Sequence, residues 1–171
     1  MASKKGFQFL SSSWLKVIAI TAMVIDHAAV IFIGEEPSLW RNIGRLAFPL
    51  FAFMIAQGAV KSGNRLKYAL RLLVFAFISE VPFDWGFHGT FFETGSQNVY
   101  FTLFLGLLSV ITLDFFLKKH LGFLSVFTTV IFALGAFFLR SDYGFMGVVV
   151  ITLMGLFCYS RSNTKYMGYA L

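Results

Sequence analysis

Three ionisable residues lie within or beside apolar runs that are long enough to enter a membrane. Asp26 and His27 interrupt the run Leu15–Ile33, and Arg45 lies near the start of the run Ile43–Val60. Because ionisable groups are costly in hydrocarbon, we expect all three to face the interior of a helix bundle and to serve a function. An imidazole beside a carboxylate suits general-base or acyl-carrier chemistry, with the carboxylate orienting the ring or pairing with the arginine. The alternative is a buried Asp26–Arg45 pair that joins two helices, with His27 a bystander.

The run that contains Arg45 combines a charge with features of tight helix packing. Small residues follow Arg45 and Pro49 along one helical face, at Ala52, Ala56 and Ala59. Small side chains let a second helix backbone approach closely. Proline has no N–H, so Pro49 cannot donate to the carbonyl of Arg45 and leaves that acceptor free.

A second group of candidates follows the third apolar run. We expect the helix to stop at Pro82, which places Glu80 at its outer end and Asp84 just beyond it. Glu80 is a candidate second acid or base, or a partner for Arg41 or Arg45. A solvated charge at a helix end explains Glu80 equally well.

Polar residues also follow one face of the fourth run, from Asn98 through Thr102 to Ser109 and Thr112. In a membrane helix, such a stripe lines a helix contact or a hydrated cavity. For Ser109 and Thr112 we expect hydroxyl groups that bond back to their own helix. Asn98 lies near the outer end and is the better site candidate.

Four basic residues separate the second run from the third: Lys61, Arg65, Lys67 and Arg71. They are candidates for binding the phosphates of an acyl-CoA, although anchoring to anionic lipid explains them more simply. The spacing of His88, Glu93, Asp84 and Glu80 matches no metal motif, so we expect no metal.

The elements that must position these residues are apolar helices. Hydrophobic residues make up 58% of the 171 residues, charged residues 13%, and mean hydropathy is +0.78, which predicts a polytopic membrane protein. The net charge of +6 is spread between the runs, so we expect no nucleic-acid partner. We predict an all-α bundle of about six transmembrane helices in a single integral membrane domain, residues 1–171. The six runs are Leu15–Ile33, Ile43–Val60, Tyr68–Val81, Val99–Phe116, Phe123–Leu139 and Phe145–Tyr159.

Charge alternates between the connections and predicts the topology. The more basic side carries Lys4, Lys5, Lys16, Lys61, Arg65, Lys67, Arg71, Lys118, Lys119, Arg161 and Lys165. The other side carries only Arg41, Arg45 and Arg140 among basic residues. Of the acids, Asp114 alone falls on the basic side, and Asp26, Glu35, Glu36, Glu80, Asp84, Glu93 and Asp142 fall on the other. Since basic connections stay in the cytoplasm, we expect both termini there.

Several stretches, in order over about residues 15–150, resemble the TraX family. They are Met23-Val24-Ile25-Asp26-His27, Ile43-Gly44-Arg45-Leu46-Ala47-Phe48-Pro49-Leu50-Phe51-Ala52-Phe53, Ile78-Ser79-Glu80-Val81-Pro82-Phe83-Asp84, Gln97-Asn98-Val99-Tyr100-Phe101-Thr102-Leu103 and Asp142-Tyr143-Gly144. The family's named activity is N-acetylation of conjugative pilin, and it is similar to a wider group of membrane acyltransferases. The resemblance also leads us to expect a shortened relative, because the family's later helices with a Tyr-Pro-x-His type element have no counterpart here.

The resemblance implies a multi-pass protein of the bacterial inner membrane, in contact with lipids. It would transfer an acyl group from cytoplasmic acetyl-CoA or another acyl-CoA to an amine or hydroxyl of a pilin-like N-terminus or a cell-surface molecule. The resemblance implies that His27 is the catalytic candidate, with Asp26, Arg45, Glu80 and Asn98 around it. Together with the residue patterns above, we expect His27, Asp26 and Glu80 to be catalytic, and we expect the substrate to be bound by Arg41, Arg45, Asn98 and Asp84. Two alternatives stay open. One is a non-enzymatic assembly factor or chaperone of a conjugation or secretion apparatus. The other is a small proton-coupled transporter, which the lack of an inverted repeat makes less attractive.

Overall fold

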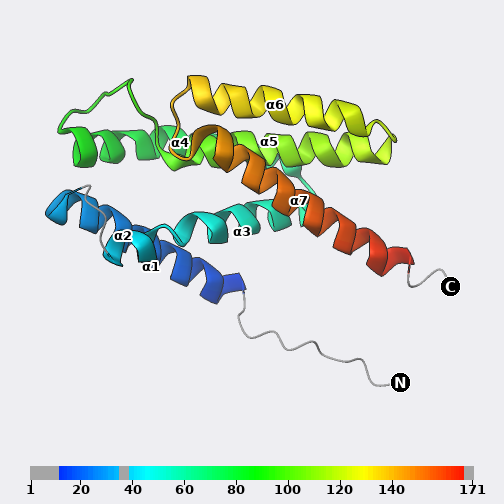
Figure 1. The fold of residues 1–171 in the computed structure, drawn as a ribbon, viewed down its shortest axis with the longest axis horizontal. Coiled ribbons are helices and arrows are strands. Elements are labelled where there is room, and N and C mark those ends of the chain that lie inside the picture. Colours follow the sequence, from blue (N-terminus) through cyan, green and yellow to red (C-terminus); the bar gives the residue numbers. More distant parts are fainter. Residues whose placement is uncertain (1–11, 35–38, 168–171) are drawn as a thin grey trace, which may run out of the picture. The chain divides into compact units, whose positions relative to one another are not determined.

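The structure, a computed structural model, describes residues 12–34 and 39–167, and these residues are all-α, as predicted. The chain forms helices α1 (Ser12–Ile33), α2 (Leu39–Gly44), α3 (Ala47–Lys61), α4 (Arg65–His88), α5 (Val99–Lys118), α6 (Gly122–Phe138) and α7 (Gly144–Met167) (Figure 1). Of the residues used to predict topology, Lys4, Lys5, Glu35 and Glu36 lie outside the described residues, as does the side chain of Lys165.

Four stretches of the described chain are long and apolar enough to cross a membrane, which supports a multi-pass membrane protein. They are Ser13–Ile33, Leu39–Lys61, Val99–Lys118 and Gly144–Arg161. The helix Gly122–Phe138 is apolar but shorter. Five of the six predicted runs each fall on a single helix, to within one residue, although α4 also carries charged residues near both of its ends. The number of crossings and the side of each terminus stay predictions.

The second predicted run is not one continuous helix. A turn at Arg45 and Leu46 separates α2 from α3, and the N–H of Leu46 donates to the carbonyl of Ile43 at 3.1 Å. Pro49 consequently lies in the first turn of α3, where backbone N–H groups have no intrahelical acceptor. The predicted free carbonyl within a helix at Arg45 is wrong, because Arg45 lies outside both helices.

The expectation that Pro82 ends a helix is also wrong. Helix α4 continues through Pro82 to His88 and ends at Gly89, whose φ of 69° is the left-handed conformation that glycine adopts easily. Proline inside a helix removes one backbone hydrogen bond, so the carbonyl of Ile78, four residues before Pro82, loses its usual backbone donor without ending the helix. Asp84 therefore lies within the helix instead of beyond it.

The chain divides into two compact units, Met1–Phe51 and Ala52–Leu171, and each is described by itself. The first unit contains α1, α2 and the start of α3. Helices α1 and α2 pack closely where Gly44 meets Asp26, because a Cβ added to Gly44 would lie 2.2 Å from the Asp26 Cβ. A single integral domain stays a prediction.

In the second unit, α5 is the central helix. It packs against α4, α6 and α7, and α6 also packs against α7 (Figure 1). Glycines bring α5 and α7 together: a Cβ on Gly106 would lie 2.4 Å from Ile151 Cδ1, and one on Gly155 would lie 2.6 Å from Val110 Cγ2. Small residues at a helix contact are typical of membrane bundles, in which close packing stabilises association.

The polar stripe on α5 faces these contacts. Ser109 does not bond back to its own helix as predicted, because its hydroxyl oxygen lies 2.7 Å from Thr152 Oγ1 on α7 and 3.0 Å from Thr129 Oγ1 on α6. Three hydroxyl groups thus meet where three helices meet, while Thr129 and Thr152 also donate to carbonyls of their own helices. Thr112 does bond back, donating to the carbonyls of Leu108 at 3.1 Å and Ser109 at 3.0 Å, so that prediction is confirmed.

Candidate functional site

In the first unit, Asp26 of α1 forms an ion pair with Arg41 of α2. The distance from Arg41 Nη1 to Asp26 Oδ1 is 3.0 Å, and both side chains are about four-fifths buried. Arg45 does not form this pair: it is exposed in the turn after α2, and no ion pair joins it to Asp26 within the described residues. The expected carboxylate–arginine link between the first two helical segments therefore exists, with Arg41 in place of Arg45. The break after Gly44 explains the change, because it removes Arg45 from the helix that faces Asp26.

His27 follows Asp26 on α1 and is half-buried. Since adjacent residues of a helix point about 100° apart, His27 lies beside the Asp26–Arg41 pair but on a neighbouring face. Its predicted role as a general base or acyl carrier stays a prediction.

In the second unit, Glu80 of α4 and Asn98 at the start of α5 lie together. Asn98 is 3% exposed. Its backbone N–H donates to Glu80 Oε2 at 3.3 Å, and its side-chain amide donates to the same oxygen and to the carbonyl of Ala76, the latter at 2.8 Å. Its side-chain oxygen accepts from the N–H of Tyr100 at 2.9 Å and so caps α5. Asn98 therefore uses every polar group of its side chain to fix α5 and one carboxylate oxygen of α4.

Two carboxylate oxygens in this region have no donor. Among the described residues, Glu80 Oε1 and Asp84 Oδ1 are buried without a hydrogen-bond partner. Asp84 is fully buried, and its other oxygen accepts from the N–H of Glu93 at 2.9 Å. Glu80 and Asp84 are one helical turn apart, so they share a face of α4. Leaving a buried carboxylate oxygen unsatisfied is costly, so such groups merit a chemical explanation.

The connection between α6 and α7 also reaches this end of the second unit. Gln97 donates from its N–H to the carbonyl of Arg140 at 3.1 Å, and its own carbonyl accepts from the N–H of Asp142 at 2.9 Å. Thr102 Oγ1 lies 2.7 Å from Ser141 Oγ and donates to the carbonyl of Asp142. The sequence did not indicate this contact, although Thr102 lies on the predicted polar stripe.

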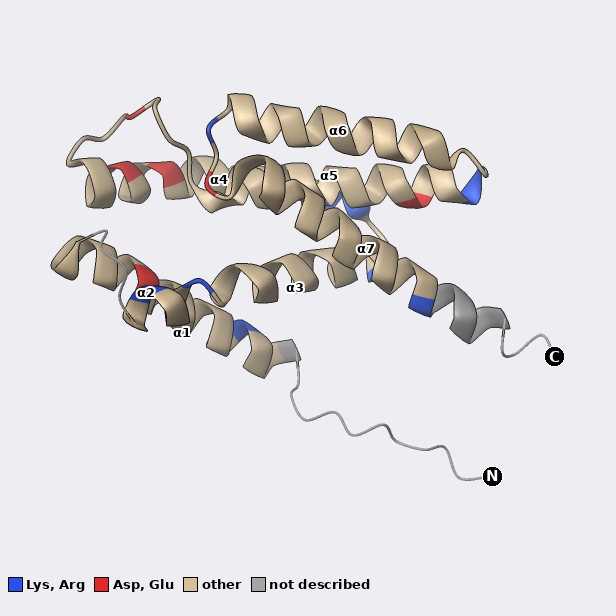
Figure 2. Cartoon of the chain, in the orientation of Figure 1, with Lys and Arg blue, Asp and Glu red and all other residues tan. Residues whose placement is uncertain are grey.

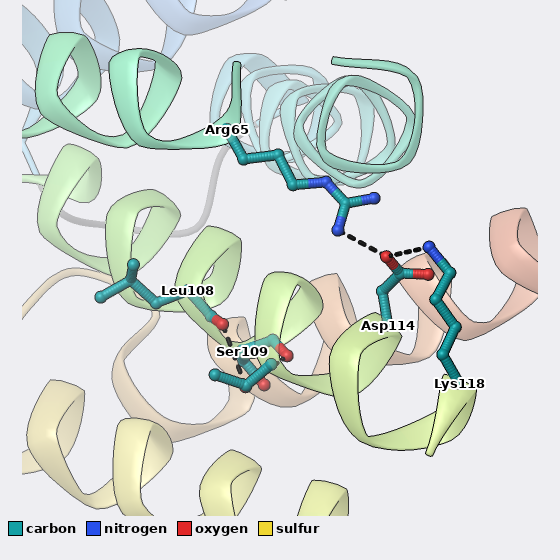
Figure 3. A network of polar contacts seen from close by, with 6 residues as sticks. Arg65, Leu108, Ser109, Asp114 and Lys118 are labelled. Carbon is teal, nitrogen blue, oxygen red and sulfur yellow. Dashed lines mark hydrogen bonds and ion pairs between the residues drawn. The ribbon is translucent and has the colours of Figure 1, made fainter. Parts of the chain in front are cut away.

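Arg65, one of the four basic residues proposed to bind phosphate, is engaged in an ion pair. Arg65 Nη1 lies 2.5 Å from Asp114 Oδ2, and Lys118 Nζ lies 2.9 Å from the same oxygen (Figure 3). The Asp114 side chain is 5% exposed, so it needs these cations. By contrast, Lys61, Lys67 and Arg71 are exposed, and within the part of the chain that the structure describes no ion pair involves them.

Two polar contacts, Arg65–Asp114 and Glu80–Asn98, lie at opposite ends of the α4–α5 pair. The Arg65–Asp114 contact joins the start of α4 to the end of α5, and the Glu80–Asn98 contact joins the later part of α4 to the start of α5. Figure 2 shows the acidic residues of α4 in the half nearest the α4–α5 connection. The two helices are therefore antiparallel, as neighbouring helices with a short connection should be.

Comparison with known proteins identifies the family. The chain matches the TraX protein family over residues 11–170. This protein belongs to the TraX family. A relative described as "Probable fimbrial assembly protein FimC, serogroup H1" of Dichelobacter nodosus is 34% identical over 175 residues, which covers 94% of this chain and 68% of the relative. No solved structure matches the chain. The resemblance expected from the sequence is confirmed.

In this TraX-family protein, the predicted site residues fall into two groups that the structure describes separately. The first unit contains Asp26, His27, Arg41 and Arg45, and the second contains Glu80, Asp84, Asn98 and the basic residues. Within the described residues, no group of three or more His, Cys, Asp or Glu side chains could hold a metal ion. What the geometry offers is acid–base and hydrogen-bonding chemistry.

Proposed function

We propose that this TraX-family protein is an integral membrane acyltransferase that modifies a component of a surface fibre during its assembly. The acyl donor is acetyl-CoA or another acyl-CoA, and the acceptor is an amine or hydroxyl of a pilin-like N-terminus or of another cell-surface molecule. The observation that carries the proposal is the pair of buried, donor-free oxygens on Glu80 and Asp84, beside an Asn98 that holds Glu80 in place.

The proposed reaction needs a base that is fixed and available. Glu80 Oε2 accepts two hydrogen bonds from Asn98, so Oε1 is the oxygen that remains to take a proton from the acceptor N–H or O–H. The acceptor atom then forms a bond to the acyl carbon, the carbon–sulfur bond of the thioester breaks, and the CoA thiolate leaves. A positioned general base contributes about 10²–10⁴-fold to such a reaction.

His27 is the second candidate base. It follows Asp26, whose carboxylate is bound to Arg41 and is therefore less available to orient the imidazole ring than the sequence predicted. The two candidates, Glu80 and His27, belong to different units and can be tested independently.

We assign phosphate binding to the basic residues that have no ion-pair partner in the described chain. Lys61, Lys67 and Arg71 fit the phosphates of an acyl-CoA, and Arg65 is a weaker candidate because it is bound to Asp114. Anionic lipid headgroups carry the same chemistry, so lipid anchoring remains the competing role for these three residues.

A non-enzymatic assembly factor is the second candidate function. The observation that favours it is the relative's description as a probable fimbrial assembly protein. This candidate predicts a stable complex with a fibre component, and it predicts that substitutions at His27 and Glu80 leave assembly unchanged.

The deciding experiment measures transfer from labelled acetyl-CoA to pilin-derived peptides and cell-surface extracts by the purified full chain in lipid nanodiscs. Glu80→Gln and His27→Ala are compared with wild type, and Glu93→Gln serves as the matched control because Gln keeps an acceptor for the Gly95 N–H. Under the proposal, Glu80→Gln lowers transfer about 100-fold or more while Glu93→Gln retains it. Equal transfer by Glu80→Gln and wild type would remove the role given to Glu80. Absence of transfer by wild type, together with stable capture of a fibre subunit, would establish the assembly factor instead.

A further inference from the structure

The turn between α6 and α7 binds the backbone of Gln97, the residue that precedes Asn98. The backbone of this turn pairs with Gln97: the Gln97 N–H donates to the carbonyl of Arg140 at 3.1 Å, and the Gln97 carbonyl accepts from the N–H of Asp142 at 2.9 Å. Because the Gln97 carbonyl and the Asn98 N–H belong to one planar peptide unit, the contact with Asp142 fixes the direction of the Asn98 N–H. That N–H is one of the two donors to Glu80 Oε2.

The turn has a backbone conformation that its surroundings must maintain. Arg140 and Tyr143 have φ values of 51° and 62°, the left-handed region that residues other than glycine rarely adopt. A non-glycine residue in this region costs of order 1 kcal/mol and persists only where neighbouring contacts determine it.

Those contacts come from two buried hydroxyl groups. Thr102 of α5 is fully buried, and Ser141 of the turn is 6% exposed. Their oxygens are 2.7 Å apart, and Thr102 donates to the carbonyl of Asp142. The hydroxyl and the N–H of Ser141 each lie 3.2 Å from the carbonyl oxygen of Ala136 on α6. The hydroxyl pair therefore ties the turn to both α5 and α6.

We infer that Thr102 and Ser141 are positioning residues for Glu80. They hold the α6–α7 turn against Gln97, the turn orients Asn98, and Asn98 binds one oxygen of Glu80 so that the other stays free. The inference rests on the proposed function for its effect on catalysis, but the positioning itself can be measured without that function.

Other hydroxyl groups of the same helix provide the comparison. Among the described residues, the Thr112 hydroxyl of α5 donates only to carbonyls of its own helix, so Thr112→Val removes a hydroxyl without affecting the turn. Thr102→Val removes the link to the turn with little change in volume. Thr102→Ser retains the hydroxyl and should therefore keep the link to the turn.

Two readouts are taken on the full chain in nanodiscs. The first is labelling of Glu80 by dicyclohexylcarbodiimide, located by mass spectrometry. When Asn98 no longer holds Oε2, labelling in Thr102→Val rises about tenfold, the equivalent of losing one hydrogen bond to a charged group. The second is acyl transfer, in which kcat falls about 10- to 100-fold with an unchanged KM for acetyl-CoA, as expected for a misplaced catalytic group.

Thr112→Val and Thr102→Ser are expected to match wild type in both readouts. The inference is overturned if Thr102→Val labels like Thr112→Val. If Thr102→Val does not fold, Ser141→Ala carries the same expectation and the same outcome decides. If wild type transfers no acyl group, the proposed function fails, and the labelling result alone supports or overturns the positioning of Glu80.

Discussion

Asn98 donates two hydrogen bonds to one oxygen of Glu80 and leaves the other oxygen without a partner in the described chain. The same side chain caps α5 through the Tyr100 N–H. One residue thus begins a helix, joins it to its neighbour and orients a carboxylate. These three roles couple stability to the candidate site at a single position.

Replacing Asn98 should therefore cost more than the loss of a helix cap. For Asn98→Ala we expect a loss of about 2–4 kcal/mol in the free energy of unfolding, the sum of a cap and of buried polar groups left unpaired. Asn64→Ala is the matched control, since Asn64 caps α4 through the Lys67 N–H at an exposed site and should cost about 1 kcal/mol. Denaturant unfolding in detergent micelles measures both. Equal losses in the two variants would contradict the coupling of Asn98 to Glu80.

Close approach of α1 and α2 depends on the absence of a side chain at Gly44. Its missing Cβ would lie 2.2 Å from Asp26 Cβ and 2.7 Å from Asp26 Oδ1, so Gly44→Ala must displace Asp26. We expect destabilisation by about 1–3 kcal/mol. Gly63→Ala is the control, because nothing lies within 4 Å of the added atom. Thermal unfolding checks both variants, and a Gly44→Ala protein as stable as Gly63→Ala would be incompatible with this packing.

Asp114 should be more sensitive to loss of Arg65 than to loss of Lys118. The Lys118 side chain is 60% exposed and that of Arg65 27%, so water replaces the lysine more easily. We expect Arg65→Ala to cost about 2–4 kcal/mol, as for a partly buried pair, and Lys118→Ala less than about 1 kcal/mol. Unfolding in detergent at low and high salt measures the difference. Equal costs would show that the Arg65–Asp114 contact is worth no more than a surface ion pair.

The remaining basic residues should act on ligand binding instead of stability. Lys67→Gln with Arg71→Gln is expected to raise the KM or Kd for acetyl-CoA about tenfold and to leave unfolding unchanged, because both side chains are exposed and unpaired in the described chain. Isothermal titration in nanodiscs of neutral lipid measures acetyl-CoA affinity without competing anionic headgroups. Each single variant, Lys67→Gln and Arg71→Gln, is also compared with Lys119→Gln at the end of α5, which removes the same single charge. Unchanged affinity, with weaker retention by anionic vesicles, would assign these residues to lipid.

The sequence by itself determined the class of this protein and its family. Apolar composition and basic connections are properties of the chain that need no three-dimensional contact, and they predict a multi-pass helical membrane protein. The ordered stretches around Asp26, Arg45, Glu80 and Asn98 likewise indicated the TraX family, which the family match confirms. Local rules also predicted the self-bonded hydroxyl of Thr112.

Only the tertiary structure decided which polar groups meet. Pro82 has the same local preference in any chain, yet in this fold α4 continues past it, and this placed Asp84 in the interior. Arg41 and Arg45 are equally suitable partners for Asp26 by charge, and the turn after Gly44 selected Arg41. Ser109 and Thr112 are similar hydroxyls on one helix, yet only Ser109 faces two other helices. In each case the choice depends on distances between segments far apart in sequence, which helix periodicity and residue type do not specify.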